Sequence, residues 1–182
     1  MFSIEVPKEV LSHCELLINR INFGNRGIGD GNKSEQLTGV IGQCTIQYLL
    51  NIPLIDFESK FDGGIDIIIN NRKIDIKTMG RKSNPKPFFV NNLIGLQIHF
   101  EVDIYIFCSL NKTNNVITVC GWISKKDFLL NASLHKKGSY RYRSDGTKFS
   151  TKADLYEIEN SKLNQISSIE DLLSQINKSK LN

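Results

Sequence analysis

The segment 65–77 constrains the fold of this chain more than any other, because two isoleucine-rich runs flank a turn signal. Asn70 and Asn71 suit a two-residue turn in which both central residues take positive φ. The two runs are therefore expected to pair as an antiparallel hairpin, with Asp66 directly opposite Asp75. Nearer the turn, the expected pairs are Ile69 with Arg72 and Ile67 with Ile74.

Side chains alternate between the two faces of a strand, so this hairpin has an apolar face and a charged face. The isoleucines on the apolar face are Ile65, Ile67, Ile69, Ile74 and Ile76. Asp66, Asp75 and Lys77 share the other face. Directly opposed Cβ atoms lie about 4.5–5.5 Å apart, and like charges at that separation destabilise the pair. The two carboxylates therefore need a shared proton or a cation between them.

Oxygen ligands suit a hard divalent ion such as Mg²⁺, which typically binds one or two carboxylates, several waters and a substrate phosphate. Lys77 points the same way as Asp75 and could contact a phosphate oxygen or the attacking water. A metal ion held by carboxylates beside an ammonium group has the parts needed for phosphodiester hydrolysis.

Asp66, followed by Asp75-Ile76-Lys77 on the next strand, resembles the motif of the PD-(D/E)XK nuclease superfamily, which includes many restriction endonucleases. The resemblance implies a restriction-endonuclease-like α/β fold, with a mixed central β-sheet flanked by helices, and cleavage of DNA with Mg²⁺, for which Mn²⁺ substitutes. It also implies that Asp66, Asp75 and the backbone carbonyl of Ile76 bind the metal, and that Lys77 orients or activates the water. Ile65 departs from the family pattern, in which a proline often precedes the first aspartate.

Other residues remain open as members of the metal site. Asp62 competes with Asp66 as the first carboxylate, although glycines separate it from the strand. Superfamily members often carry an acidic residue on the helix before the hairpin. Glu35 is the carboxylate available there, but it also completes a capping box with Asn32. Gln43, two turns further along, carries no charge but could hydrogen-bond a metal-bound water.

The chain is expected to form a single domain over residues 1–182. An N-terminal helix from Pro7 and a glycine-rich loop occupy 1–32, a core occupies 33–160, and a C-terminal helix lies in 161–182. Within the core, further elements are predicted as follows: a short strand at 55–58, a helix from Asn91 or Asn92 to Phe100, central strands at 102–109 and 116–123, a short helix from Ser124, and a strand at 155–159.

Two basic segments are candidates for holding a DNA backbone. The first is a non-regular loop expected at 78–87, and the second is a projecting hairpin at 136–148 in which tyrosines and arginines alternate. The candidate DNA-binding residues are Arg81, Lys82, Lys86, Arg141, Arg143 and Lys148. Alternating aromatic and basic residues suit a nucleic-acid-facing ribbon. A solvated loop and an edge hairpin kept soluble by its charges are the alternative interpretations.

The composition permits these interpretations without requiring them. The net charge of +4 is mildly basic. The sequence shows neither a transmembrane run nor a signal peptide, so a cytoplasmic protein without a membrane partner is expected, in a viral (phage-encoded) or host-defence setting by analogy. The four cysteines lack Cys-x-x-Cys spacing, which favours buried free thiols over a zinc site or disulfides.

The sequence therefore predicts a Mg²⁺-dependent deoxyribonuclease, an endonuclease in the first instance, that hydrolyses DNA with metal-activated water. A homodimer would suit cleavage of both strands of a duplex. The alternative is a non-catalytic nucleic-acid-binding protein on the same scaffold, because the acidic contribution from the first core helix is not secured by the sequence.

Overall fold

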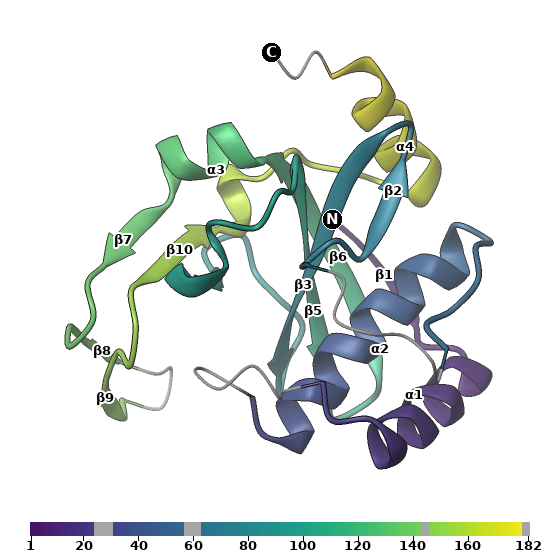
Figure 1. Ribbon diagram of the computed structural model, residues 1–182, viewed down its shortest axis with the longest axis horizontal. Coiled ribbons are helices and arrows are strands. Elements are labelled where there is room, and N and C mark those ends of the chain that lie inside the picture. The colour runs from purple at the N-terminus through teal and green to yellow at the C-terminus, as the bar shows by residue number, and fades with distance from the viewer. Residues whose placement is uncertain (24–30, 57–62, 143–145, 180–182) are drawn as a thin grey trace.

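The computed structural model describes residues 1–23, 31–56, 63–142 and 146–179 (Figure 1). Two helices, α1 (Lys8–Arg20) and α2 (Lys33–Leu49), begin where the sequence predicts them, after Pro7 and Asn32. Asn32 and Glu35 form the expected reciprocal capping box at the start of α2. The helices pack against each other and cover one face of a mixed β-sheet (Figure 1).

The central sheet contains five of the described strands, in the order β1–β6–β5–β3–β2. Their bounds are β1 Phe2–Glu5, β6 Val116–Ser124, β5 Ile104–Asn111, β3 Arg72–Arg81 and β2 Ile67–Ile69. β3 and β5 run parallel, and the other neighbours run antiparallel. Every residue of β5 is buried, as expected for a central strand covered on both faces.

The predicted hairpin is confirmed as β2 and β3. Its turn residues Asn70 and Asn71 have φ angles of 49° and 62°, and Ile69 and Ile67 pair with Arg72 and Ile74 as expected. Ile67, Ile74 and Ile76 are buried in the core beneath α1 and α2. Two expectations were wrong: Ile65 packs on the opposite side of the sheet, and β3 continues through 78–81, where a loop was expected. Continued pairing with β5 keeps these residues in the strand.

A second, smaller sheet covers the other face of the central one. It has the described strands β4 (Val90–Ile94), β10 (Leu155–Glu159) and β7 (Ser133–His135), in that order. Its apolar side chains pack with α3 (Lys125–Asn131) and the central sheet into a second core. The members of that core include Leu93, Tyr105, Phe107, Phe128 and Ile158. β10 was predicted at these bounds, whereas β7 and β1 were not.

The helix expected from Asn91 or Asn92 to Phe100 was wrong. This segment contains strand β4 and a short 3₁₀ turn, Gly95–Gln97. Asn91 is fully buried, pairs with Ile158 in the sheet and donates through its side chain to Asn160 Oδ1 at 2.7 Å. These partners lie far along the chain, and they override the local helical spacing of the leucines.

The remaining elements lie at the ends of the molecule (Figure 1). Ser168 caps α4 (Ile169–Lys178), and Gln175 on this helix accepts a hydrogen bond from Trp122 on β6. A two-stranded hairpin, β8 (Tyr140–Tyr142) with β9 (Lys148–Ser150), projects beside the second sheet. In the short strand expected at 55–58, residues 55 and 56 are not in a strand, and 57 and 58 lie outside the described residues.

The chain is a single mixed α/β domain with a mixed central sheet, as predicted. Helices α1 and α2 cover one face of that sheet, whereas the other face is covered by the unpredicted second sheet together with α3. Its four cysteines, all among the described residues, are buried free thiols, which confirms that expectation. None of the described helices has the length and apolar character that crossing a bilayer requires.

Candidate active site

Asp66 lies where the ladder between β2 and β3 ends. Its N–H donates to the carbonyl of Ile74 at 2.9 Å, and its carboxylate Oδ2 accepts the N–H of Ile76 at 2.6 Å. The side chain therefore takes the place of the next ladder carbonyl. This bond holds the Asp66 carboxylate beside the peptide that joins Asp75 to Ile76.

The backbone polar groups of Ile76 point towards the side of β3 on which Asp66 lies. The N–H and C=O groups of one strand residue point towards the same neighbouring strand. Because the Ile76 N–H points to Asp66, its carbonyl also points to the β2 side of β3, beyond the first residue of β2. A carboxylate oxygen and a peptide oxygen are thus directed into one region.

Asp75 and Lys77 form an ion pair on the face of β3 that looks towards the second core. The Lys77 Nζ lies 2.7 Å from Asp75 Oδ1. The Asp75 side chain is only 1% exposed, whereas Lys77 is 20% exposed. The ammonium therefore lies between a buried carboxylate and solvent, where its charge acts in a medium of low effective dielectric constant.

Tyr105 on β5 is the register partner of Asp75 and packs against Phe107 and Phe128. It is fully buried, and its hydroxyl has no hydrogen-bond partner among the described residues. Burial raises the pKa of Tyr105, and the negative charge of Asp75 raises it further, so the hydroxyl stays protonated as a donor. A buried hydroxyl without a hydrogen bond is rare, and this one places a polar atom among apolar side chains of the core.

Helix α2 brings Gln43, and not Glu35, to the hairpin. The Gln43 Nε2 lies 3.4 Å from the backbone oxygen of Asp66. Close packing makes this approach possible, because a Cβ added to Gly42 would lie 1.7 Å from Thr78 Oγ1 on β3. Glu35 instead accepts the Asn32 N–H in the capping box, about 12 Å further along the helix. The alternative carboxylate Asp62 lies outside the described residues.

The first basic segment does not form one exposed group. Arg81 is half-buried at the end of β3, donates to the carbonyl of Val90 at 2.5 Å and stacks 4.9 Å from the ring centre of Phe89. Burial lowers the pKa of Arg81 from its ordinary value. Lys82 and Lys86 are exposed. Arg81 therefore joins β3 to β4, and the two lysines are the residues free to meet a ligand.

The second basic segment forms the predicted hairpin, but its Arg141 turns inward. Arg141 makes two hydrogen bonds to the buried carboxylate of Glu157 on β10, one of them from Nε at 3.2 Å. His135 on β7 lies 3.3 Å from the same carboxylate. Lys148 is exposed, and Arg143 lies outside the described residues. Sequence reasoning missed Glu157, for which the signal was an acidic residue at an inward position of a predicted strand.

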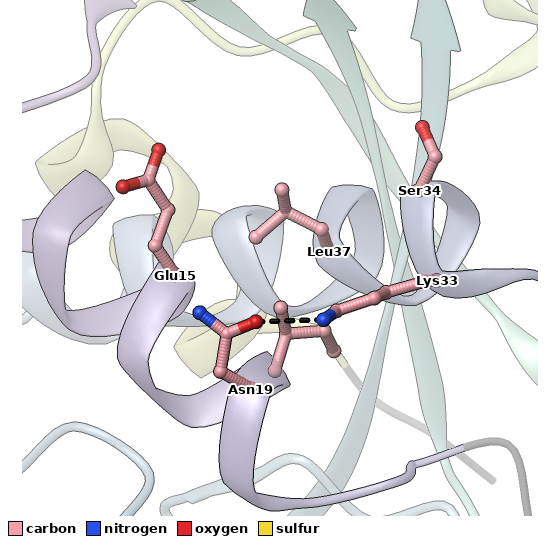
Figure 2. A pocket seen from close by; sticks show the side chains of 6 residues that line it. Glu15, Asn19, Lys33, Ser34 and Leu37 are labelled. Carbon is pink, nitrogen blue, oxygen red and sulfur yellow. Dashed lines mark hydrogen bonds between the residues drawn. The ribbon is translucent and has the colours of Figure 1, made fainter.

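A hollow of about 390 Å³ lies between α1 and α2, away from the hairpin (Figure 2). Glu15 and Asn19 from α1 face Lys33, Ser34 and Leu37 from the first turns of α2 across it. The Lys33 ammonium donates to Asn19 Oδ1 at 2.6 Å and closes one side. The lining residues lie on α1 and in the first turns of α2, and none of them belongs to the hairpin, so the hollow is separate from the hairpin site.

Comparison with known proteins gives no family assignment: no family model, curated protein or solved structure matches this chain. Within the described ranges, no cluster of three or more His, Cys, Asp or Glu side chains could hold a metal ion. The candidate donors at the hairpin are instead two carboxylates and one peptide carbonyl.

Proposed function

We propose that this protein is a Mg²⁺-dependent deoxyribonuclease that hydrolyses phosphodiester bonds as an endonuclease. The observation that carries the proposal is that the Asp66 carboxylate and the Asp75–Lys77 ion pair both adjoin the peptide between Asp75 and Ile76 on β3. The Asp66 carboxylate is fixed on the N–H of Ile76, and the Lys77 ammonium lies 2.7 Å from Asp75. These groups belong to the residues whose sequence resembles the motif of the PD-(D/E)XK nucleases.

The donors at this place fit a hard divalent cation. Asp66, Asp75 and the Ile76 carbonyl would hold the ion, and all three present oxygen, the ligand that Mg²⁺ and Mn²⁺ prefer. An ion bound there would supply a water of lowered pKa and positive charge against the phosphate. Gln43, whose amide reaches the backbone of Asp66, is within the same region and could hydrogen-bond a bound water.

The residues of the chain have separate tasks in this proposal. The hydrogen bond from Ile76 prevents Asp66 from rotating away, so little reorganisation is needed when the site is loaded. Lys77 has one side against Asp75 and the other towards solvent, which leaves its ammonium able to approach a phosphate. Its charge would orient the attacking water and stabilise the negative charge that develops on the phosphate.

Exposed lysines would hold the DNA backbone outside the reaction centre. Lys82, Lys86 and Lys148 meet this requirement because their side chains are exposed. Arg81 and Arg141 are proposed as supports of this surface, since their guanidinium groups bind Val90 and Glu157 within the protein. A homodimer would allow two such sites to cut both strands.

Plasmid cleavage tests the proposal. Purified protein should nick or linearise supercoiled plasmid with Mg²⁺ or Mn²⁺ and not with EDTA. Lys77→Ala should reduce the rate by roughly 10²–10³-fold, as expected for loss of a group that stabilises developing charge. Lys73→Ala is the matched control, because Lys73 lies on the same strand but pairs with Glu101 at 3.2 Å. Equal rates for both variants would contradict the role of Lys77.

A non-catalytic nucleic-acid-binding protein is the second candidate function. It is favoured by the position of Glu35, whose carboxylate is engaged in the capping box, so α2 supplies an amide and no acid to the hairpin. On this proposal the protein binds DNA at low salt but leaves plasmid intact with every divalent ion tested. That result would reject the nuclease.

A further inference from the structure

The β8–β9 hairpin has two chemically different faces. Tyr140 pairs with Ser150, Arg141 with Phe149, and Tyr142 with Lys148. Because side chains alternate along each strand, Tyr140, Tyr142, Lys148 and Ser150 share one face, while Arg141 and Phe149 share the other. The face with the tyrosines points away from the second sheet, since Arg141 on the opposite face binds Glu157 of β10.

This orientation is fixed at two points. The first is the pair of hydrogen bonds from Arg141 to the Glu157 carboxylate, which is 7% exposed, and such two-point arginine–carboxylate contacts hold a defined geometry. The second is the base of the hairpin, where Gly138 N–H donates to Thr151 O at 2.8 Å and Thr151 N–H donates to Ser139 O at 2.9 Å. The tyrosine face is therefore presented to solvent by a braced ribbon.

The outward face carries two rings and an ammonium group. Tyr140 and Tyr142 are 65% and 68% exposed. The Nζ of Lys148 lies 3.8 Å from the centre of the Tyr140 ring, a cation–π contact. Lys137 and Lys152, near the base of the hairpin, are also exposed. Two neighbouring aromatic faces with positive charge beside them are complementary to flat rings that carry phosphate.

We propose that this face binds single-stranded DNA by stacking unpaired bases on Tyr140 and Tyr142, with Lys148 contacting the adjoining phosphate. The choice of DNA rests on the proposed function, and the inference specifies its substrate class: DNA with an unpaired segment. In a duplex the π-faces of the bases are covered by their neighbours and the grooves present base edges. Aromatic side chains on a basic surface instead bind unpaired bases with little sequence preference.

Binding measured without metal tests this inference apart from catalysis. The probe is a fluorescein-labelled oligothymidylate of about 16 nucleotides, the upper end of the site size for one small single-strand-binding fold. A blunt duplex of the same length is the comparison, and anisotropy is measured in EDTA. Wild type should bind the single strand more tightly. Tyr140→Ala/Tyr142→Ala should weaken that binding by at least about fivefold, and by up to roughly 150-fold for each base that loses its ring.

Two further variants separate stacking from other effects. Tyr140→Phe/Tyr142→Phe keeps both rings and should retain wild-type affinity. Tyr48→Ala removes a 43% exposed tyrosine at the end of α2 and should also bind as wild type does. Thermal unfolding followed by circular dichroism confirms that each variant is folded.

The inference is overturned if wild type binds the duplex at least as tightly as the single strand, or if the double alanine variant binds like wild type. Its failure is distinct from failure of the proposed function. Plasmid cleavage together with tyrosine-independent binding removes this inference alone. Tyrosine-dependent binding by a protein that cuts no plasmid keeps this inference and rejects the nuclease.

Discussion

Replacing Lys77 with methionine tests the hairpin site without any substrate. Methionine keeps much of the side-chain volume but leaves the buried Asp75 carboxylate without the ammonium that lies 2.7 Å from it. Removing one partner of a fully buried ion pair costs about 3–5 kcal/mol. Because Lys77 retains 20% exposure, the expected loss in the free energy of unfolding is at the lower end, about 3 kcal/mol near pH 7.

A double-mutant cycle separates the ion pair from packing. Asp75→Asn keeps the shape of the side chain and leaves an ammonium that can reach water, so a loss of about 1 kcal/mol is expected. Asp75→Asn/Lys77→Met removes both charges and should lose about 2 kcal/mol, which gives a coupling energy of about 2 kcal/mol. Urea unfolding in EDTA, followed by circular dichroism, measures all four proteins.

Mn²⁺ then distinguishes a metal site from a structural ion pair. An ion held by Asp75 replaces the positive charge that Lys77→Met removes. The difference in the free energy of unfolding between wild type and this variant should therefore shrink when Mn²⁺ is added. At about 100 times its Kd, the ion stabilises wild type by about 2.7 kcal/mol. Asp66→Asn and Asp75→Asn should lose most of that gain. Equal stabilisation of wild type and both asparagine variants, or a coupling energy near zero, would refute the reasoning.

Three other predictions concern side chains elsewhere in the domain. Gly42→Ala should destabilise the protein by about 1–3 kcal/mol in urea unfolding, because its Cβ would meet Thr78 Oγ1 at 1.7 Å, whereas Gly39→Ala, with open space at its Cβ, should stabilise by up to about 1 kcal/mol. Tyr105→Phe should stabilise by about 1 kcal/mol in the same assay by removing a buried unbonded hydroxyl, and destabilisation would mean that the hydroxyl is bonded in solution. Asp154→Asn should lower the midpoint of thermal unfolding at pH 7. The pKa of the Asp154 carboxyl is lowered by a backbone N–H and then by a lysine ammonium, so the charged carboxylate stabilises the protein above pH 3.8 and this stabilisation is lost on protonation. The difference in midpoint between wild type and variant should therefore vanish as the pH falls below 3.8.

The sequence correctly predicted the features that are determined by residues close together along the chain. Asn70 and Asn71 tolerate positive φ, which specified the turn and hence the register of β2 and β3. Asn32 and Glu35 specified the start of α2 through their mutual hydrogen bonds. That register was predicted correctly as far as Ile67 and Ile74, because pairing in a hairpin is fixed by its turn. The predicted pair of Asp66 with Asp75 is not part of the ladder, since Asp66 bonds to the carbonyl of Ile74 and the N–H of Ile76.

Partners distant in the sequence decided the features that were missed. Asn91 belongs to β4 because Ile158 and Asn160 complete its hydrogen bonds, and nothing near residue 91 encodes that. Arg141 turns inward because Glu157 is buried behind it. The basic residues were predicted from composition and spacing, which do not reveal whether a guanidinium group binds solvent or a carboxylate of the same chain.

The pairing of β1 with β6 has a consequence for synthesis on the ribosome. Phe2 pairs with Val119, so β1 has no partner while α1 and α2 are being translated. Until β6 is synthesised, β1 cannot pair with it at the edge of the central sheet, and long-range pairing of this kind slows folding. Once made, β6 exposes an apolar strand edge until β1 docks, and an open edge can recruit other chains. Deleting residues 2–5 should therefore lower the soluble yield more than it lowers the helix content.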